Sequence, residues 1–354
     1  MKQIRLGIVG TGLAFERLHL PVIQELNDKF QIVAICDVDH VKAEEWGRKL
    51  GLPSDRVFTD LHRMIELPDI DAFDVIVPIE ANYAVTRQVA AARKPIICEK
   101  PLGGSLEEAA AHRDLAKQAG VPIMIAENYR YNEEVNLLRD LVRTRRVGDP
   151  IYFIQNETVD FPQLMTGPDS YAHREWRQHP QFEGGIFLDT GVHHMAALRH
   201  IFGAVRTVSA FGRRQQEDFG PFSLIQVNMV FHSGVMGHYS FFVQGKEVQR
   251  PLIGLRIFGT GGQIYLEDRE CGVINIFYKD GRHEMINFRP HRGYYNEFLN
   301  FWKAAVGEEP ISVTPEMEFG DAKMVFDILR SARAEGVPVD VDRTAEYTPQ
   351  YQTV

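Results

Sequence analysis

The chain has 354 residues, of which 44% are hydrophobic and 25% are charged. This length and this composition are typical of a globular protein with two domains. The formal net charge of -9 argues against a nucleic-acid or anionic-membrane partner, because such partners need a basic excess that neutralises phosphates.

The start of the chain and its cysteines indicate a cytoplasmic protein. Met1-Lys2-Gln3 leads directly into an apolar run, so we expect no signal peptide. No apolar stretch approaches the ~20 residues that cross a bilayer. Cys36, Cys98 and Cys271 lie far apart without metal-ligand spacing. We expect them to be small core residues in a reducing compartment, and we expect no metal site.

The first motif is an apolar run, Ile4–Val9, that ends in Gly10-Thr11-Gly12. A strand buried between two helix layers has such a run, and Gly10 would allow a tight turn after it. Gly12 would let the backbone approach a pyrophosphate, which the N–H groups of the following helix favour. Phe15 stands where G-x-G-x-x-G has a third small residue, and an ordinary strand–turn–helix is the alternative. The predicted pyrophosphate site comprises Gly10, Thr11, Gly12, Leu13 and Ala14.

A second apolar run, Phe30–Cys36, ends at Asp37. In a dinucleotide-binding unit, the acid after the second strand hydrogen-bonds the adenosine ribose and repels a 2′-phosphate. No arginine or lysine follows Asp37 at once, so the sequence favours NAD, while NADP stays open. The alternative is that Asp37 caps the helix expected at Val41–Leu50.

Strand and helix patterns then alternate as far as residue 126. The expected elements are the helices Leu61–Glu66, Ala84–Ala92 and Leu106–Gly120 and the strands Ala72–Val77, Ile96–Cys98 and Pro122–Ala126. This alternation predicts βαβ units in a doubly wound parallel sheet. Ligands bind beyond the carboxyl ends of such strands. These ends carry Pro78, Glu99, Lys100, Asn128, Tyr129 and Arg130.

Lys100 directly follows one of these apolar runs, so its ammonium should project into the crevice at the strand ends. A lysine there can hydrogen-bond a substrate hydroxyl. The alternative is a surface lysine that pairs with Glu99.

These residues together resemble the Gfo/Idh/MocA oxidoreductases, a family that includes inositol and sugar dehydrogenases. The resemblance is carried by Gly10-Thr11-Gly12, Asp37, Pro78 and above all Glu99-Lys100-Pro101. It implies a Rossmann domain with Lys100 as a catalytic residue beside the nicotinamide, and with Pro78, Glu99 and Asn128 among the cofactor contacts. The family often has T-P-N-x-x-H, whereas this chain has Val77-Pro78-Ile79-Glu80-Ala81-Asn82, so the asparagine and the histidine of that element are absent.

The pattern changes after about Tyr131, and the later part of the chain contains Asp189 and His193, four residues apart. If Gly184-Gly185 opens a helix, both side chains lie on one face, and a carboxylate beside an imidazole suits a general base. The alternative is a surface Asp–His pair. We interpret His194 and His200 as structural.

The resemblance also covers this segment, because G-G-x-x-x-D-x-G-x-H looks like the second signature of the family. It implies that Asp189 and His193 join Lys100 in the site, and that Trp176 and Arg177 lie near the cofactor. Ala196 stands where the family often has an acid. Tyr129 and Arg130 could face the substrate, although Arg130 could equally anchor the two domains through a salt bridge.

Several strands between Val205 and Tyr278 alternate with period 2 and are followed by the helices Tyr294–Ala305 and Pro315–Glu335. They predict an α+β domain with a large, mostly antiparallel open sheet and a helix layer on one face. We expect domains at residues 1–127 and 128–354, with the C-terminal helices able to pack back on the first. The open face is expected to carry Phe241, Val243 and Ile257, and to form a homodimer or homotetramer.

The predicted function is an NAD-dependent dehydrogenase that acts on a secondary alcohol of a sugar, cyclitol or related polyol. Its substrate specificity is expected in the loop Phe161–Gln181 and in Tyr129, Tyr171 and His179. Two alternatives stay open: a hydrolase or lyase that uses bound NAD in a transient redox cycle, and a sensor that binds a dinucleotide and a sugar.

Overall fold

The computed structural model describes residues 3–167, 170–214, 220–243 and 253–341. By compactness the chain divides into two units, Met1–Asn128 with Gly293–Phe319 and Tyr129–Arg292 with Gly320–Val354. The first unit is therefore built from two segments that are far apart in the sequence. The predicted division at residues 127 and 128 instead assigned the later segment, Gly293–Phe319, to the second domain.

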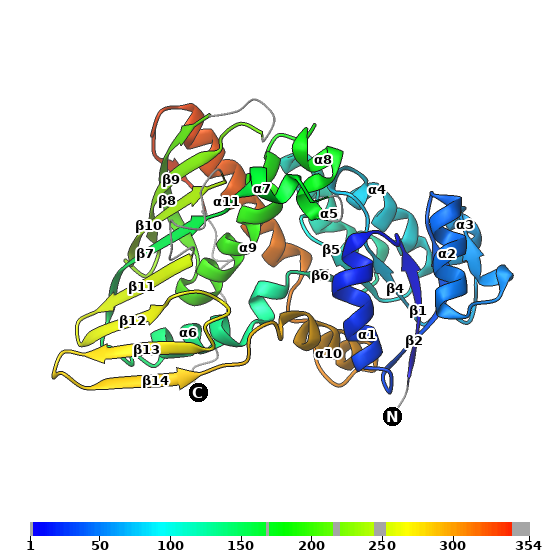
Figure 1. Ribbon diagram of the computed structural model, residues 1–354, viewed down its shortest axis with the longest axis horizontal. Coiled ribbons are helices and arrows are strands. Elements are labelled where there is room, and N and C mark those ends of the chain that lie inside the picture. The colour runs from blue at the N-terminus through cyan, green and yellow to red at the C-terminus, as the bar shows by residue number, and fades with distance from the viewer. Residues whose placement is uncertain (1–2, 168–169, 215–219, 244–252, 342–354) are drawn as a thin grey trace. The chain divides into compact units, whose positions relative to one another are not determined.

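A six-stranded parallel sheet in the order β3-β2-β1-β4-β5-β6 forms the centre of the first unit (Figure 1). Its strands are β1 (Ile4–Val9), β2 (Phe30–Cys36), β3 (Val57–Phe58), β4 (Ala72–Val75), β5 (Ile96–Glu99) and β6 (Ile123–Ala126). The helices along the chain are α1 (Leu20–Glu25), α2 (His40–Leu50), α3 (Leu61–Ile65), α4 (Ile79–Val89) and α5 (Leu106–Ala119). The strand order reverses next to β1, which is the ligand-binding point of a doubly wound sheet. The prediction of this fold is confirmed.

The helix after β1 widens into a π-helical turn, Phe15–His19, before it continues as α1. Pro21 has no N–H group, and its ring crowds the preceding turn of a regular helix. The N–H of Leu20 donates instead to the carbonyl of Phe15, five residues back. The helix therefore passes the proline by widening, and His19 is fully buried on this turn.

The returning segment completes the first unit with α10 (Gly293–Ala305), which packs against α1 and β6. The ring of Phe298 meets the ring of Phe30 edge-on, with 5.8 Å between the centroids. Beyond α10, the carbonyl of Val313 accepts a hydrogen bond from the N–H of Ile125 at 3.1 Å. The segment is thus joined to the edge strand β6 and to the core.

A nine-stranded sheet in the order β14-β13-β12-β11-β7-β10-β9-β8-β15 forms the second unit (Figure 1). β7 and β10 pair in parallel, and the other pairings described are antiparallel. The strands are β7 (Pro150–Thr158), β8 (Val205–Arg213), β9 (Leu224–Phe231), β10 (Met236–Phe242), β11 (Ile253–Gly259), β12 (Gly262–Leu266), β13 (Val273–Tyr278), β14 (His283–Asn287) and β15 (Val339–Asp340). The helices are α6 (Glu133–Arg143), α7 (Phe161–Met165), α8 (Glu175–Gln178), α9 (Gly185–Phe202) and α11 (Pro315–Arg333), whose first residues belong to the first unit. This confirms the predicted mostly antiparallel sheet.

The prediction of which residues lie on the open face of this sheet is wrong. Phe241, Val243 and Ile257 are all buried, and the ring of Phe241 lies 5.4 Å from that of Phe187 on α9. Alternation shows that the side chains of a strand point to two opposite faces of the sheet, but it does not show which face a helix covers. If the covered face is assigned wrongly, every residue of the strand is placed on the wrong side. The open face carries other side chains, among them Ser240 and Asn156, whose Oγ and Oδ1 lie 2.6 Å apart.

One expectation for the cysteines is also wrong. Cys36 and Cys98 are buried, but Cys271 is exposed. Its Sγ lies 3.1 Å from the carbonyl of Asp268 in the loop between β12 and β13. Within the described ranges, no helix has the length and apolar character that crossing a bilayer requires, and no cluster of three or more His, Cys, Asp or Glu side chains there suits a metal ion.

A buried ionic triad lies inside the second unit. The guanidinium of Arg130 makes three hydrogen bonds to Asp321 of α11, the shortest of them 2.6 Å. Nε of Arg199, on α9, donates to the same carboxylate at 2.7 Å. All three side chains are at most 4% exposed, so each charge needs the others in place of water.

We predict that Asp321→Asn destabilises the protein by about 3–5 kcal/mol, because two buried guanidinium groups then lose their shared anion. Glu284→Gln is the matched control, since the side chains of its ion pair with Arg146 are 33% and 49% exposed and solvent screens such a surface pair. Urea denaturation followed by circular dichroism measures both. Equal losses in the two variants would contradict the assignment.

Candidate functional site

The glycine turn after β1 meets two separate steric demands. Gly10 has a φ of +94°, and a Cβ there would stand 2.1 Å from the carbonyl oxygen of Ile76. A Cβ on Gly12 would meet nothing within 4 Å. Gly10 is therefore required by the fold, whereas Gly12 leaves open space above the start of the helix, as close approach of a pyrophosphate demands.

Asp37 holds the glycine turn from the end of β2. Its Oδ2 accepts hydrogen bonds from the N–H of Thr11 at 2.8 Å and from its hydroxyl at 2.7 Å. Its Oδ1 accepts from the N–H of Asp39 at 2.9 Å. The cap of α2 is Asp39, which accepts from Val41 and Lys42, so the alternative that Asp37 caps this helix is wrong. A contact between Asp37 and a ribose stays a prediction.

These features fit a dinucleotide. Leu13 and Ala14 begin the helix that follows the turn and are half-buried there, so its amide end faces the space above Gly12. Asn128, beyond β6, is 4% exposed, and its side-chain oxygen has no hydrogen-bond partner among the described residues. A buried acceptor of this kind suits a donor on a ligand. Pro78 is exposed at the start of α4.

Lys100 is half-buried at the carboxyl end of β5, and the turn that carries it is held from both sides. Oε2 of Glu99 accepts the N–H of Lys100 at 3.1 Å. The side-chain amide of Asn82 donates to the carbonyl of Glu99 and, at 2.9 Å, to that of Pro101. Asn82 stands at the position of the histidine in T-P-N-x-x-H. Although the histidine is absent, a polar side chain at this position still bonds the turn.

In the second unit, α9 begins at Gly185 as predicted and carries Asp189 and His193 one turn apart. The guanidinium of Arg177, from α8, binds the carboxylate of Asp189 at 2.9 Å. It also lies over the ring of Trp176, 4.7 Å from the ring centroid. Asp189 is 4% exposed, so this ion pair fixes a nearly buried carboxylate beside the predicted base.

Tyr129 stacks on His193, with 4.5 Å between ring centroids and 13° between ring planes. The guanidinium of Arg269, in the loop after β12, covers the tyrosine ring at 3.9 Å and bonds its hydroxyl. The aromatic stack restricts the imidazole to one orientation. Arg269 is a residue of this cluster that the sequence did not indicate.

A second layer of polar groups lies beneath this stack. The hydroxyl of Tyr239 lies 2.7 Å from Nδ1 of His194, and Nε2 of the same ring lies 3.5 Å from Oε2 of Glu157. Burial lowers the pKa of His194 to about 3 and raises the pKa of Glu157 to about 8. Both groups are therefore neutral at pH 7, which agrees with the structural role predicted for His194.

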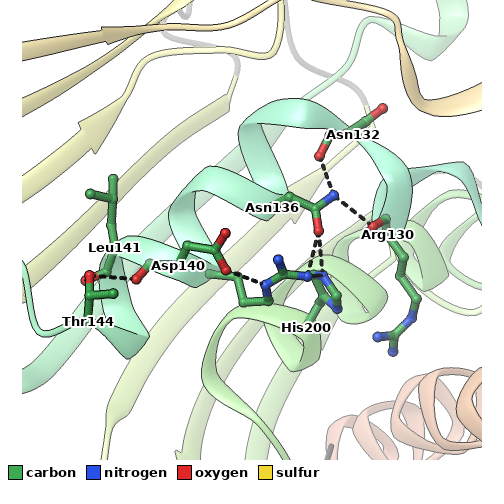
Figure 2. Close-up of polar contacts among 8 residues, drawn as sticks. Arg130, Asn132, Asn136, Asp140, Leu141, Thr144 and His200 are labelled. Carbon is green, nitrogen blue, oxygen red and sulfur yellow. Dashed lines mark hydrogen bonds and ion pairs between the residues drawn. The ribbon is translucent and has the colours of Figure 1, made fainter. Parts of the chain in front are cut away.

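The guanidinium of Arg130 is held in the ionic triad with Asp321, which lies in the same unit. Figure 2 shows the backbone of this residue in a second cluster, where its carbonyl accepts a hydrogen bond from Asn136 at 3.0 Å. Oδ1 of Asn136 lies 3.1 Å from Nε2 of His200. This geometry argues against a substrate contact for Arg130, and it gives His200 a structural partner.

Two residues with unusual environments were missed in the sequence. His19 and Asp74 are both fully buried in the first unit, and 2.9 Å separates Nδ1 of His19 from Oδ2 of Asp74. The signal was an acid inside the apolar run of β4, because a buried carboxylate needs a partner. His19 and Asp74 are 55 residues apart in the sequence, so no local pattern indicated that they form a pair.

Comparison with known proteins bears on both units. Residues 4–127 match a family model described as an oxidoreductase family with an NAD-binding Rossmann fold. Residues 135–265 match the model of the Gfo/Idh/MocA C-terminal domain. The chain belongs to the Gfo/Idh/MocA oxidoreductases. The predicted family, its enzymatic character and its cofactor are thereby confirmed.

Relatives in this family resemble the chain over almost its whole length. The myo-inositol 2-dehydrogenase of Thermotoga maritima is 26% identical over 91% of this chain and 93% of its own. The NAD(+)-dependent scyllo-inositol 2-dehydrogenase of Bacillus subtilis is 25% identical over 98% of each. The crystal structure of an oxidoreductase from Thermotoga maritima has a TM-score of 0.85 and 28% identity, and the match covers 96% of this chain and 99% of that one.

We predict that Gly12→Ala leaves stability unchanged within about 0.5 kcal/mol but weakens NAD binding, because its methyl group enters the space above the turn. Gly10→Ala should destabilise the fold instead, since its Cβ collides with backbone. Thermal unfolding and NAD titration calorimetry separate the two effects. Unchanged NAD affinity in Gly12→Ala would contradict the pyrophosphate assignment.

Glu157 predicts a pH dependence of stability. Its folded pKa is raised above the ordinary value, so its carboxyl favours the folded state at low pH, and stability falls as the pH rises toward about 8. The fall is about 1.4 kcal/mol per pH unit for one such group. Glu157→Gln removes this titration, so its urea midpoint should decline less than that of the wild type from about pH 5 to about pH 8. Parallel declines would show that Glu157 is not responsible.

Proposed function

We propose that this protein is an NAD-dependent dehydrogenase that oxidises a secondary alcohol of a sugar, cyclitol or related polyol. Two relatives that match it over most of their length are named inositol 2-dehydrogenases. The observation that carries the proposal is the turn at Lys100. It places a half-buried lysine at the carboxyl end of β5, in the unit whose glycine turn fits a dinucleotide.

The residues of the proposed site divide the proton chemistry between them. Bound NAD would accept a hydride from the alcohol carbon. The ammonium of Lys100 would donate a hydrogen bond to the alcohol oxygen and stabilise the negative charge that develops on it. His193 would take the hydroxyl proton, because imidazole exchanges protons near neutral pH.

The neighbours of His193 support this assignment. Arg177 holds the carboxylate of Asp189, which lies one helical turn from His193. In this position the carboxylate would favour the imidazolium that forms. Tyr129 stacks on the imidazole and would also limit the shape of the substrate. We propose that Trp176 and Arg177 border the cofactor, and that the described parts of the loop Phe161–Gln181 contribute to specificity.

We also propose that copies of the chain associate through the open face of the nine-stranded sheet. The register aligns Phe258, Tyr152 and Met236 across β11, β7 and β10, and Met236 is 54% exposed. A row of apolar side chains on an uncovered sheet face is typical of a subunit interface.

The test is NADH formation by the purified protein with NAD and a panel of sugars and cyclitols, with substrate loss followed in parallel. We expect NADH in step with substrate loss, and a decrease of about 100-fold or more in kcat for Lys100→Ala, because an oxyanion-stabilising donor is removed. Lys94→Ala, which changes a lysine outside the proposed site, should retain activity. Substrate loss without net NADH would indicate a hydrolase or lyase that recycles NAD and would overturn the proposal.

A further inference from the structure

The interior of the first unit contains a histidine that is bonded on both sides. Nδ1 of His19 lies 2.9 Å from Oδ2 of Asp74 on β4, and Nε2 lies 2.9 Å from Oε1 of Glu99 on β5. The imidazole is completely buried. Each carboxylate accepts a hydrogen bond best from an N–H group, and a ring with two N–H groups is an imidazolium. Both acids raise the pKa of His19 well above its ordinary value, against the opposing effect of burial.

The group that His19 binds is the glutamate that holds Lys100. Oε1 of Glu99 faces the imidazole, while Oε2 accepts the backbone N–H of Lys100 at 3.1 Å. A carboxylate can accept at both oxygens, but a protonated carboxyl would lose one acceptor. The imidazolium favours the charged form of Glu99 and therefore preserves its bond to Lys100.

Helix α10 supplies other groups that surround His19. α10 closes the cluster, with the ring of Phe298 edge-on to that of His19 at 5.1 Å between centroids. Glu297 on the same helix is fully buried, and neither of its carboxyl oxygens has a hydrogen-bond partner among the described residues. Burial raises the pKa of Glu297 well above its ordinary value. Burial thus favours the uncharged form of Glu297, whereas His19 lies within hydrogen-bond distance of both Asp74 and Glu99.

We propose that His19 is a positioning residue for Lys100: its imidazolium, bridged between Asp74 and Glu99, orients Glu99 so that the turn presents the lysine side chain to the substrate. The inference rests on the proposed function, because it assigns His19 a role through Lys100. Among the described residues, the titratable groups that face His19 are Asp74 from β4, Glu99 from β5, and Tyr294 and Glu297 from α10.

The first test uses the free protein and no substrate. The 15N shifts of His19 should show both ring nitrogens protonated at pH 8, where an ordinary histidine is neutral. Hydrogen exchange at the amide of Lys100 should be roughly 10-fold faster in His19→Asn, because one hydrogen bond is weakened. The amide of Ile76, which bonds the carbonyl of Val9, reports whether the sheet is intact. A neutral ring at pH 8, or unchanged exchange at Lys100, would overturn the proposal.

The second test separates positioning from simple stabilisation. His19→Asn alone leaves Asp74 buried without its cation and should lower stability, so it is compared with the double variant His19→Asn, Asp74→Asn, which pairs two neutral amides. We expect the double variant to recover thermal stability but to keep a kcat about 100-fold below the wild type, as misplaced catalytic groups cause. Its KM for NAD should change less than about 3-fold, because the glycine turn is untouched.

Full recovery of kcat in the double variant would show that His19 is only structural and would overturn the proposal. The two hypotheses fail in different ways. If the wild type forms no NADH with any substrate, the proposed function loses its support, while the ring protonation and the exchange at Lys100 still decide the role of His19.

Discussion

The first unit depends on how charge is held inside a parallel sheet. Both faces of such a sheet are covered, so a carboxylate at the centre has no water to solvate it. Asp74 and Glu99 satisfy this constraint with one imidazolium from the helix after β1. That helix can supply it because it widens before Pro21 and carries His19 inward. Glu99 also accepts the N–H of Lys100 in the turn after β5. One carboxylate therefore connects the buried histidine to the proposed catalytic lysine.

Much of the fold could be predicted because its signals are local. An apolar run that ends in two glycines, and acids or a lysine directly after later runs, identify strands and their carboxyl ends without any long-range information. The helix that carries Asp189 and His193 followed in the same way from Gly184-Gly185. The family resemblance then indicated which of these residues to expect in the site, and the spacing along each element predicted the strand end or helix face that carries them.

The remaining features could not be predicted because they depend on pairings between distant segments. Which face of the nine-stranded sheet α9 covers is decided by packing, so Phe241 was assigned to the wrong side. The partner of Arg130 is Asp321, and no local pattern connects these two residues. Arg269 reaches Tyr129 from a loop between strands. Each of these contacts is determined by tertiary structure, on which sequence periodicity carries no information.

The discontinuity of the first unit has a consequence for how the chain folds during synthesis. Domains generally fold in order from the N-terminus as the ribosome releases them. Here the six strands emerge first, but α10, whose Phe298 covers His19, emerges only after most of the second unit. Until then the His19 cluster stays open to water, and the nascent sheet lacks one of its helices. The N-terminal unit is therefore completed only late in synthesis, and its dinucleotide-binding fold matures only when nearly the whole chain has been made.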